Sequence, residues 1–347
     1  MAAELPTTYR AIELTALHAE PERALESLRV AERPLPKPGP GEVLVRVSAS
    51  PVNPSDLLFV TGHYVVEREL PTVPGWEGSG RVVAAGGGGY AKLLKGRRVA
   101  CAAREQGPGT WGEYTLVPAM QCLPLLSGVD DEQGASLIVN PVSAFAMLHM
   151  ARRRGARAVV STAAASQLGR MVLALAKRWN FPVIHVVRRA AQVELLRGLG
   201  AQFVLDSSDE DFDEQLAAAC ARLEASVALD AIGGPWPQRL LRAMGPRSRV
   251  VCYGVLDESP TFELSAMDIL GGGCAVEGFY LGQWLPKQPP HRVLRIALQL
   301  QRALASGRIR TEVARRVDLD ELPQAILEYY RSMTAGKTLL KPHGDAG

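Results

Sequence analysis

The 347-residue sequence lacks several features that would place it in a specialised class of protein. It has no uninterrupted apolar run of about 18 residues, so a membrane-spanning helix is not expected. Its 39 Lys and Arg residues nearly balance 36 Asp and Glu residues, and no basic block stands out that could follow a nucleic-acid backbone. The first residues lack the basic start and apolar stretch of a signal peptide. We therefore expect a cytoplasmic protein that binds neither membranes nor nucleic acids.

Cysteine and histidine are few and scattered. The five cysteines, at positions 101, 122, 220, 252 and 274, are odd in number and far apart, which argues against a disulfide framework. No CxxC pair and no HExxH sequence brings two metal-ligating side chains together. We therefore expect buried, reduced cysteines and no metal site.

What is present is ordinary globular composition, with 47% apolar and 22% charged residues, and the length predicts two domains. The first third contains short strand-like segments separated by turns, as in a partly closed β-barrel or sandwich. The predicted strands span residues 42–48, 78–85, 97–102 and 112–117. The glycine run at 86–89 is interpreted as a turn and not as a phosphate loop, because no helix signal follows it.

The pattern changes near residue 130, where an acidic start opens a helical stretch that reaches residue 150. Strands and helices then alternate. The predicted strands span 156–162, 182–187, 202–205, 226–232, 249–253 and 274–281, and the helices between them span 168–179, 192–199, 209–223 and 237–244. Continuous apolar strands of this kind predict an α/β domain of the Rossmann type, a doubly wound parallel sheet with helices on both faces.

The tail carries two predicted helices, 292–305 and 322–333, and a last strand, 338–341. We assign residues 130–284 to the Rossmann-type domain. Residues 1–129 and 285–347 together form the β-rich domain in this interpretation.

The turn between the first strand and helix of a Rossmann-type domain is where such folds bind a pyrophosphate. Here it reads STAAASQLG over residues 161–169, and only the last glycine of the GxGxxG pattern is kept. Small side chains at Ala165 and Ser166 would still let a phosphate approach the first N–H groups of the helix, at Gln167 and Leu168. We name these four residues as candidate cofactor ligands, with an ordinary strand–helix turn as the alternative.

The end of the second strand indicates which dinucleotide would bind. Arg188 and Arg189 stand where an NAD site usually places an acid, and no acid follows before Glu194. Guanidinium groups suit the 2′-phosphate of NADP, because they can donate two parallel hydrogen bonds to it. We therefore expect NADPH as the cofactor, with a solvated helix start as the alternative.

The order of β-rich front, dinucleotide domain and short return tail resembles the medium-chain dehydrogenase/reductase superfamily over nearly the whole chain. Its landmarks are similar to VNPSD at 52–56, PGWEG at 74–78, DAIGG at 230–234 and the pair Tyr253 and Gly254. Zinc-dependent members carry a Cys and a His where this chain has Pro54 and Trp76, which cannot ligate zinc. The resemblance therefore implies a GroES-like catalytic domain and a zinc-free branch, the quinone oxidoreductases or the 2-enoyl thioester reductases.

Four further segments resemble the enoyl thioester reductases. They are GHY at 62–64, GTW at 109–111, VNPVS at 139–143 and GFYLGQW at 278–284, of which the last is the most specific. Quinone oxidoreductases share the first landmark and often the tyrosine, so both branches stay open.

The resemblance implies roles for individual residues. Tyr64 would donate a proton or hydrogen bond at the substrate carbonyl, and Asn53 would orient the carbonyl or the nicotinamide. A surface tyrosine and an Asn-Pro turn are the alternatives. Further cofactor contacts are expected from Asn140, Ser143, Gly233, Tyr253, Gly254 and Phe279. Walls of an acyl pocket are expected from Trp76, Trp111 and Trp284, with core packing as the alternative for each.

Two features concern partners. The basic run at 152–154 could attract a phosphate-bearing carrier such as coenzyme A, or it could simply be the basic end of a helix. The resemblance implies a homodimer formed through an edge strand at 274–280.

Three functions remain open from the sequence. The first is an NADPH-dependent 2-enoyl thioester (enoyl-CoA/ACP) reductase, which sends hydride to Cβ and a proton to Cα without zinc. The second is an NADPH:quinone oxidoreductase or alkenal reductase. The third is a catalytically silent NADPH-binding or structural protein with a degenerate site, which the altered phosphate turn favours. Activity with crotonyl-CoA against a simple quinone separates the first two, and a folded protein that binds no NADPH would favour the third.

Overall fold

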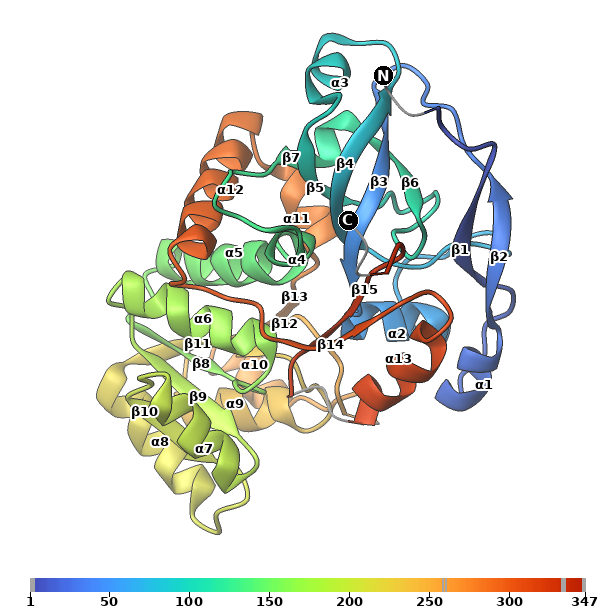
Figure 1. The fold of residues 1–347 in the computed structure, drawn as a ribbon. Helices are drawn as coiled ribbons and strands as arrows, with labels where there is room; N and C mark the ends of the chain where they lie inside the picture. Colours follow the sequence, from blue (N-terminus) through green and yellow to red (C-terminus); the bar gives the residue numbers. More distant parts are fainter. Residues whose placement is uncertain (1–3, 258, 260, 332–334, 345–347) are drawn as a thin grey trace. The chain divides into compact units, whose positions relative to one another are not determined.

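The computed structural model describes residues 4–257, 259, 261–331 and 335–344 (Figure 1). They form two compact units. One contains the residues up to Val139 together with those from Ala297 on, and the other is Asn140–Ile296. The expected domain limits differ from these bounds at two places, since 130–139 belongs to the first unit and 285–296 to the second.

The second unit is built on a six-stranded parallel sheet with the order β10-β9-β8-β11-β12-β13. The strands are β8 (Ala158–Ser161), β9 (Val183–Val187), β10 (Phe203–Asp206), β11 (Ala225–Asp230), β12 (Arg249–Cys252) and β13 (Ala275–Gly278). The four inner strands, β9, β8, β11 and β12, carry buried Val, Ile and Leu residues, as expected for strands covered on both faces. The predicted doubly wound α/β sheet is confirmed, and the chain reverses direction across the sheet between β8 and β11.

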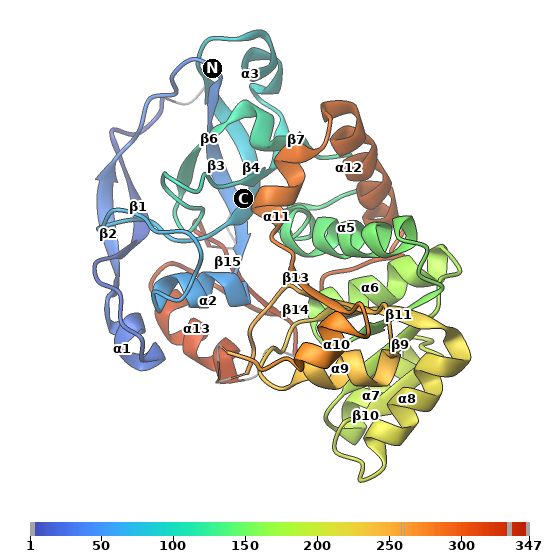
Figure 2. The same ribbon diagram turned by 180° about the vertical axis from the view of Figure 1, so that it is seen from behind.

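Helices cover both faces of this sheet. The helices of this unit are α5 (Val139–Arg153), α6 (Gln167–Arg178), α7 (Ala190–Gly198), α8 (Phe212–Leu223), α9 (Trp236–Met244), α10 (Ala266–Leu270), α11 (Leu281–Trp284) and the start of α12 (Pro290–Ala305). On one face α8 and α9 lie side by side in both views and bury Phe212 and Leu240 against the strands (Figures 1 and 2). A separate cluster contains Leu173 of α6 and Leu196 of α7.

The first unit is β-rich and mainly antiparallel. Its sheet has the order β14-β15-β3-β4-β5-β7, and β6 pairs with β3. Its strands are β3 (Glu42–Pro51), β4 (Glu77–Ala85), β5 (Arg98–Ala102), β6 (Tyr114–Pro118), β7 (Cys122–Pro124), β14 (Val313–Val317) and β15 (Lys337–Leu340), and a separate hairpin joins β1 (Thr8–Leu14) to β2 (Leu28–Pro34). The expected strands of the first third are therefore confirmed, with end shifts of one to three residues.

Short helices complete the first unit. They are α1 (Pro21–Glu26), α2 (Pro54–Val60), α3 (Gly89–Leu94), α4 (Asp131–Ala135) and α13 (Leu322–Arg331). The glycine run at 86–89 is followed by α3, so the expectation that no helix follows it is wrong. A Cβ on Gly86 would lie 1.8 Å from the carbonyl oxygen of Gly39, which explains a glycine there by close backbone approach. The expected end of the 322–333 helix lies outside the described residues.

The long helix expected from 130 to 150 is two helices, α4 and α5. The backbone N–H groups of Ile138 and Val139 donate to the buried carboxylate of Glu77, over 3.0 and 2.8 Å. A carboxylate at this position satisfies N–H groups that have no acceptor within a helix, and it fixes the start of α5. Glu77 lies far from this segment in the sequence, so its capping role had no local signal, whereas Pro141 in the first turn of α5 is a local sign of a helix start.

Among the residues that the structure describes, every helix is too short or too polar to cross a membrane.

Candidate functional site

The turn from β8 to α6 forms a compact cradle in the second unit. The hydroxyl of Ser166 accepts a 3.1 Å hydrogen bond from the N–H of Gly169 and caps α6. A Cβ on Gly169 would lie 2.4 Å from the carbonyl oxygen of Ala164, so glycine is required where the helix packs on the turn. Gln167 and Leu168 occupy the first two helical positions, where N–H groups have no acceptor within the helix.

The side chains of this cradle are small or turned inward. Ala164 and Ala165 are buried, and Gln167 is only 5% exposed. Ala163 adopts a positive φ of 46°, a conformation that the usual pattern leaves to glycine. The backbone therefore makes the expected turn although the glycines are missing, and the positive end of α6 lies at its opening.

A buried clasp joins the carboxyl ends of the two central strands. The hydroxyl of Thr162, just after β8, donates a 2.6 Å hydrogen bond to Asp230 at the end of β11. Asp230 also accepts from the N–H groups of Ile232 and Gly233 over 3.2 and 3.0 Å. Burial raises the pKa of Asp230, while these hydrogen bonds act against that shift. The clasp fixes the loop that holds Gly233, and neither Thr162 nor Asp230 was given a role from the sequence.

The two predicted phosphate-binding arginines follow β9, next to the cradle. The N–H of Ala164 donates to the carbonyl oxygen of Val186 over 3.1 Å, which places the turn beside the end of β9. Arg188 and Arg189 are exposed, and within the described chain neither guanidinium has a hydrogen bond or ion pair. Both side chains can therefore turn to an anion at the cradle without losing a protein partner.

The remaining cofactor candidates also lie in the second unit. Asn140 and Ser143 are buried in the first turns of α5. Tyr253 follows β12, and its N–H donates to the carbonyl oxygen of Asp230 over 2.8 Å. Phe279 follows β13, and its N–H donates to the carbonyl oxygen of Cys252 over 2.7 Å.

Gly254 packs closely on the loop after β11, since a Cβ there would lie 2.9 Å from the carbonyl oxygen of Ala231. The hydroxyl of Tyr253 is buried without a hydrogen-bond partner among the described residues, and burial raises its pKa. An orphaned hydroxyl, a capped helix start and two unpaired guanidinium groups all suit a dinucleotide with phosphate groups.

An aromatic stack in the first unit contains the candidate acid Tyr64. Its ring is half-buried, and its centroid lies 5.1 Å from that of Trp76. Phe59 meets Trp76 edge-on at 5.3 Å. The guanidinium carbon of Arg68 lies 4.4 Å from the Trp76 ring centroid, and three backbone carbonyls accept hydrogen bonds from the Arg68 side chain. Arg68, which the sequence did not single out, thus holds Trp76 against Tyr64.

Asn53 lies in a buried polar network of the first unit. Its side-chain oxygen accepts from Lys337, and its amide donates to Glu77 over 3.2 Å. Its backbone N–H donates to Asp56 over 2.7 Å. Asn53 is 1% exposed, and its side-chain amide and backbone N–H hold the start of α2 through these partners. The expected contact of Asn53 with a carbonyl or the nicotinamide stays a prediction.

Burial dominates the protonation of this network. It raises the pKa of Asp56 to about 7 and that of Glu77 to about 6, and it lowers the pKa of Lys337 to about 8. Lys337 also donates to the carbonyl oxygen of Val52 over 3.1 Å. The ammonium group therefore ties β15 to the start of α2 from a position that sequence reasoning missed.

The three candidate tryptophans differ in environment. Trp111 is fully buried, and its ring N–H donates to the carbonyl oxygen of Pro51 over 3.4 Å. This burial in the first unit favours core packing, the alternative given for Trp111, over a place in the wall of a substrate pocket. Trp76 is 8% exposed, within the stack. Trp284 is half-buried and does line a pocket, in the second unit.

Metal ligands and thiols offer little chemistry. In the described part of the chain, no three His, Cys, Asp or Glu side chains gather as a metal site would require. Pro54 and Trp76, at the positions matched to zinc ligands, have no atom that can bind zinc. The cysteines are free and buried, apart from the half-buried Cys252, as predicted.

Two family descriptions match the chain. Residues 39–127 match the alcohol dehydrogenase GroES-like domain, and residues 168–299 match a domain described as zinc-binding dehydrogenase. The mitochondrial enoyl-[acyl-carrier-protein] reductase of Mus musculus is 27% identical over 304 residues, which is 86% of this chain and 80% of the relative.

Solved structures match over almost the full length. A protein of Mesorhizobium loti assigned as an NADPH:quinone reductase is 34% identical, with a TM-score of 0.88 over 98% of this chain and 100% of that chain. A mycobacterial protein solved with NADPH is 25% identical, with a TM-score of 0.80 over 96% and 100%. With a parallel dinucleotide-type sheet, a GroES-like unit and these relatives, the chain belongs to the medium-chain dehydrogenase/reductase superfamily of oxidoreductases.

Proposed function

We propose that this oxidoreductase uses NADPH to reduce the activated C=C bond of a 2-enoyl thioester, without zinc. The observation that carries the cofactor assignment is the exposed pair Arg188 and Arg189 beside the cradle, whose guanidinium groups have no partner in the described part of the chain. The likeness to enoyl-[acyl-carrier-protein] reductases over 86% of the chain supports the substrate class.

The second unit supplies the binding groups. The N–H groups at the start of α6 hold the pyrophosphate, and the hydroxyl of Ser166 keeps that helix start in place. Arg188 and Arg189 hold the 2′-phosphate by charge-assisted hydrogen bonds. Bound NADPH supplies a hydride, which in an enoyl thioester goes to Cβ.

The first unit supplies the proton. The phenol hydroxyl of a tyrosine is a hydrogen-bond and proton donor, so Tyr64 can donate to a substrate in which negative charge develops. Trp76 and Arg68 fix the ring of Tyr64, which reduces the entropy lost on reaching a reactive arrangement. The proton completes the reduction at Cα. Asn53 contributes by holding the start of α2.

A second candidate function has its own support. The structure from Mesorhizobium loti assigned as an NADPH:quinone reductase is 34% identical to this chain, more than the enoyl reductase relative. A quinone or alkenal accepts hydride in the same way and needs the same donor at its oxygen.

The proposal includes a homodimer. Among the residues that the structure describes, β13 pairs with β12 alone, and an unpaired strand edge is a template for another copy. The neighbouring α10 leaves Met267 and Leu270 exposed at 70% and 80%. Light scattering is expected to give twice the mass of the chain, and a monomer would contradict this part of the proposal. The predicted cytoplasmic location remains a prediction.

The decisive experiment compares acceptors at saturating NADPH. NADPH oxidation is measured with crotonyl-CoA and with a simple quinone, and kcat/KM is determined for each. A higher kcat/KM with crotonyl-CoA is expected. Preference for the quinone would establish the second candidate, and NADPH binding without turnover of any acceptor would support the catalytically silent alternative.

A further inference from the structure

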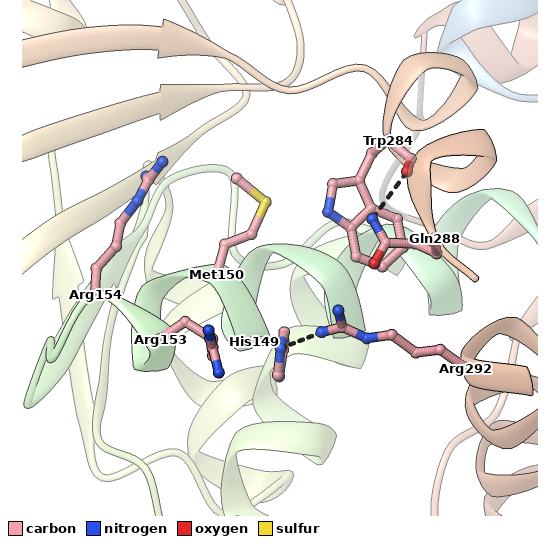
Figure 3. Close-up of a pocket in the computed structure, with 7 residues that line it drawn as sticks. All are labelled: His149, Met150, Arg153, Arg154, Trp284, Gln288 and Arg292. Atoms are coloured by element: carbon pink, nitrogen blue, oxygen red, sulfur yellow. Dashed lines mark hydrogen bonds between the residues drawn. The ribbon is translucent and has the colours of Figure 1, made fainter.

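A pocket opens in the second unit at the end of α5, away from the cradle residues. It has a volume of about 230 Å³ and lies against the first turn of α12 (Figure 3). Its lining residues are His149, Met150, Arg153, Arg154, Trp284, Gln288 and Arg292. Three of these seven side chains are arginines, so the pocket carries concentrated positive charge.

The positive charge is only partly neutralised. Glu277 of β13 forms an ion pair with Arg154 through both carboxylate oxygens. Arg153 is exposed and, within the described chain, its guanidinium has neither a hydrogen bond nor an ion pair. Arg292 donates to the ring Nε2 of His149, so that nitrogen must be unprotonated. Counting Arg153, Arg154 and Arg292 against Glu277 leaves two positive charges around a cavity.

The pKa of His149 indicates the same excess of positive charge. Its pKa is lowered by burial first and then by Arg292, Arg153 and Arg152. An arginine normally donates to a carboxylate or phosphate, and donation to a neutral imidazole leaves its charge uncompensated. The pocket therefore has an excess of positive charge, which a bound anion would neutralise.

The basic run at 152–154 does not act as one cluster. Arg153 and Arg154 line the pocket, whereas Arg152 stacks on Trp179 with its guanidinium carbon 5.3 Å from the ring centroid. Cations at the end of α5 also suit the helix dipole, but that alone would not bring Arg292 from another helix to the same cavity.

The rest of the wall indicates what carries the anion. Trp284 and Met150 present apolar surface beside the guanidinium groups (Figure 3). The cavity is smaller than the roughly 300–1,000 Å³ of pockets that enclose drug-sized ligands, so an organic phosphate bound here keeps part of its organic group outside the cavity. Planar guanidinium groups on one side and an aromatic ring on another suit a phosphate attached to an organic group.

We propose that this pocket is a binding site for a phosphate monoester, with Arg153 and Arg292 on the phosphate and Trp284 against its organic part. The site goes beyond the proposed reductase activity and does not depend on it. The same chemistry could come from free phosphate or from a nucleotide, and the two are separated by experiment.

Calorimetry on the full chain tests the site. Inorganic phosphate and adenosine monophosphate are titrated into protein saturated with NADPH, which keeps the cradle occupied. Adenosine monophosphate is expected to bind at one site and more tightly than inorganic phosphate. Equal affinity for the two, or no binding, would overturn the assignment to a monoester. Loss of all binding in the presence of NADPH, with binding in its absence, would overturn a site separate from the cradle.

Variants locate the binding. The double variant Arg153→Gln with Arg292→Gln is expected to bind adenosine monophosphate at least about ten-fold more weakly, because two charge-assisted hydrogen bonds are lost. The matched control Arg157→Gln removes an exposed arginine of the same unit that pairs with Glu224, and it should leave the Kd unchanged. Equal Kd values for the double variant and the wild type would overturn the site.

His149 gives a second readout that needs no loss of folding. A dianion beside Arg153 and Arg292 favours the protonated imidazole, so the pKa of His149 measured by NMR should rise on addition of adenosine monophosphate. The facing charges are Arg152, Arg153, Arg154, Arg292 and Glu277. An unchanged pKa of His149 at saturation would contradict binding in this pocket.

Discussion

The hydroxyl of Thr162 lies 2.6 Å from a carboxylate oxygen of Asp230, and it also accepts a 2.9 Å hydrogen bond from the N–H of Ala231. One hydroxyl thus joins the end of β8 to the end of β11, where the sheet order reverses. Open α/β sheets bind ligands outside this point. The side chain of Thr162 therefore links the stability of the sheet to the conformation of the loop that holds Gly233.

Replacement of Thr162 by Val keeps the shape and removes the hydroxyl. Asp230 is then buried with one hydrogen bond fewer, which should lower the free energy of unfolding by about 1–3 kcal/mol. Urea denaturation measures this loss, and fluorescence titration should show weaker NADPH binding. Thr162→Ser keeps the hydroxyl and serves as the control. Identical stability of the Val and Ser variants would show that the clasp contributes nothing.

The selectivity for NADPH is expected to depend on Arg188 and Arg189. Each charge-assisted hydrogen bond contributes about 1.5–3 kcal/mol, and 1.4 kcal/mol is a factor of about ten in affinity. Replacing both by Ala should raise the Kd of NADPH by roughly 10–100-fold or more and leave that of NADH nearly unchanged. Arg178→Ala, at the exposed end of α6, is the control. Equal losses for both nucleotides would show that the arginines do not contact the 2′-phosphate.

Tyr64→Phe removes the proposed proton donor and keeps the ring on Trp76. A positioned acid contributes about 10²–10⁴-fold to the rate, so kcat with the better acceptor should fall by that order. The Kd of NADPH should stay the same, since the groups proposed to bind the cofactor lie in the other unit. Tyr330→Phe, at a 48% exposed tyrosine, controls for loss of a hydroxyl. An unchanged kcat for the Tyr64 variant would remove this residue from the mechanism.

Gly169 is expected to tolerate no side chain. Since a Cβ would lie 2.4 Å from the Ala164 oxygen, Gly169→Ala must push α6 away from the turn, at a cost of about 1–3 kcal/mol. The displacement should also weaken NADPH binding. Gly198→Ala is the matched control, because a Cβ there meets nothing within 4 Å, and it should be neutral or stabilising by about 0.5–1 kcal/mol. Thermal unfolding of both variants checks the contrast.

The sequence allowed prediction of those helices and strands that have a regular local pattern of apolar residues. The apolar strands and intervening helices of the second unit carry their own periodicity, so the parallel sheet was predictable. The hairpin of β1 and β2 was missed, because its strands lie 13 residues apart in the sequence with a short helix between them. The start of α5 was missed although Pro141 lies in its first turn, and its capping group, Glu77, belongs to another element.

The site was predictable to a similar degree. The cradle at Ser166 and the arginines after β9 follow a known strand–turn–helix order, and the structure places them side by side. Lys337, Arg68 and Thr162 act through partners distant in sequence, and nothing near them signalled a role. Trp111 was selected because it belongs to the GTW segment at 109–111. The sequence cannot show whether such a tryptophan packs in the core or lines a pocket, because this depends on its burial in the fold.

The buried network of Asp56, Glu77 and Lys337 should make stability depend on pH. In the folded protein the pKa values of Asp56 and Glu77 are about 7 and about 6, above their ordinary values of 3.8 and 4.5. The folded state therefore binds these protons more tightly than the unfolded chain does. The resulting stability is fully present at low pH and is lost as pH rises through the folded pKa values.

Lys337 affects stability at a higher pH than the two carboxyl groups do. Its pKa is lowered from 10.5 to about 8, so above about pH 8 the folded protein releases this proton before the unfolded chain does. Stability is then regained between these two values. Lys337→Met should nevertheless destabilise the protein by about 3–5 kcal/mol near neutral pH, because it leaves buried carboxylates without their cation.

The test is the free energy of unfolding measured at several pH values from about 4 to about 8. Asp56→Asn removes the group with the largest upward shift, so the decline across this range should become shallower than in the wild type. Asp320→Asn, at an exposed carboxylate paired with Arg10, should keep the wild-type slope. If the Asp56 and Asp320 variants show the same slope, the decline arises elsewhere, and the buried network does not control the pH dependence of folding.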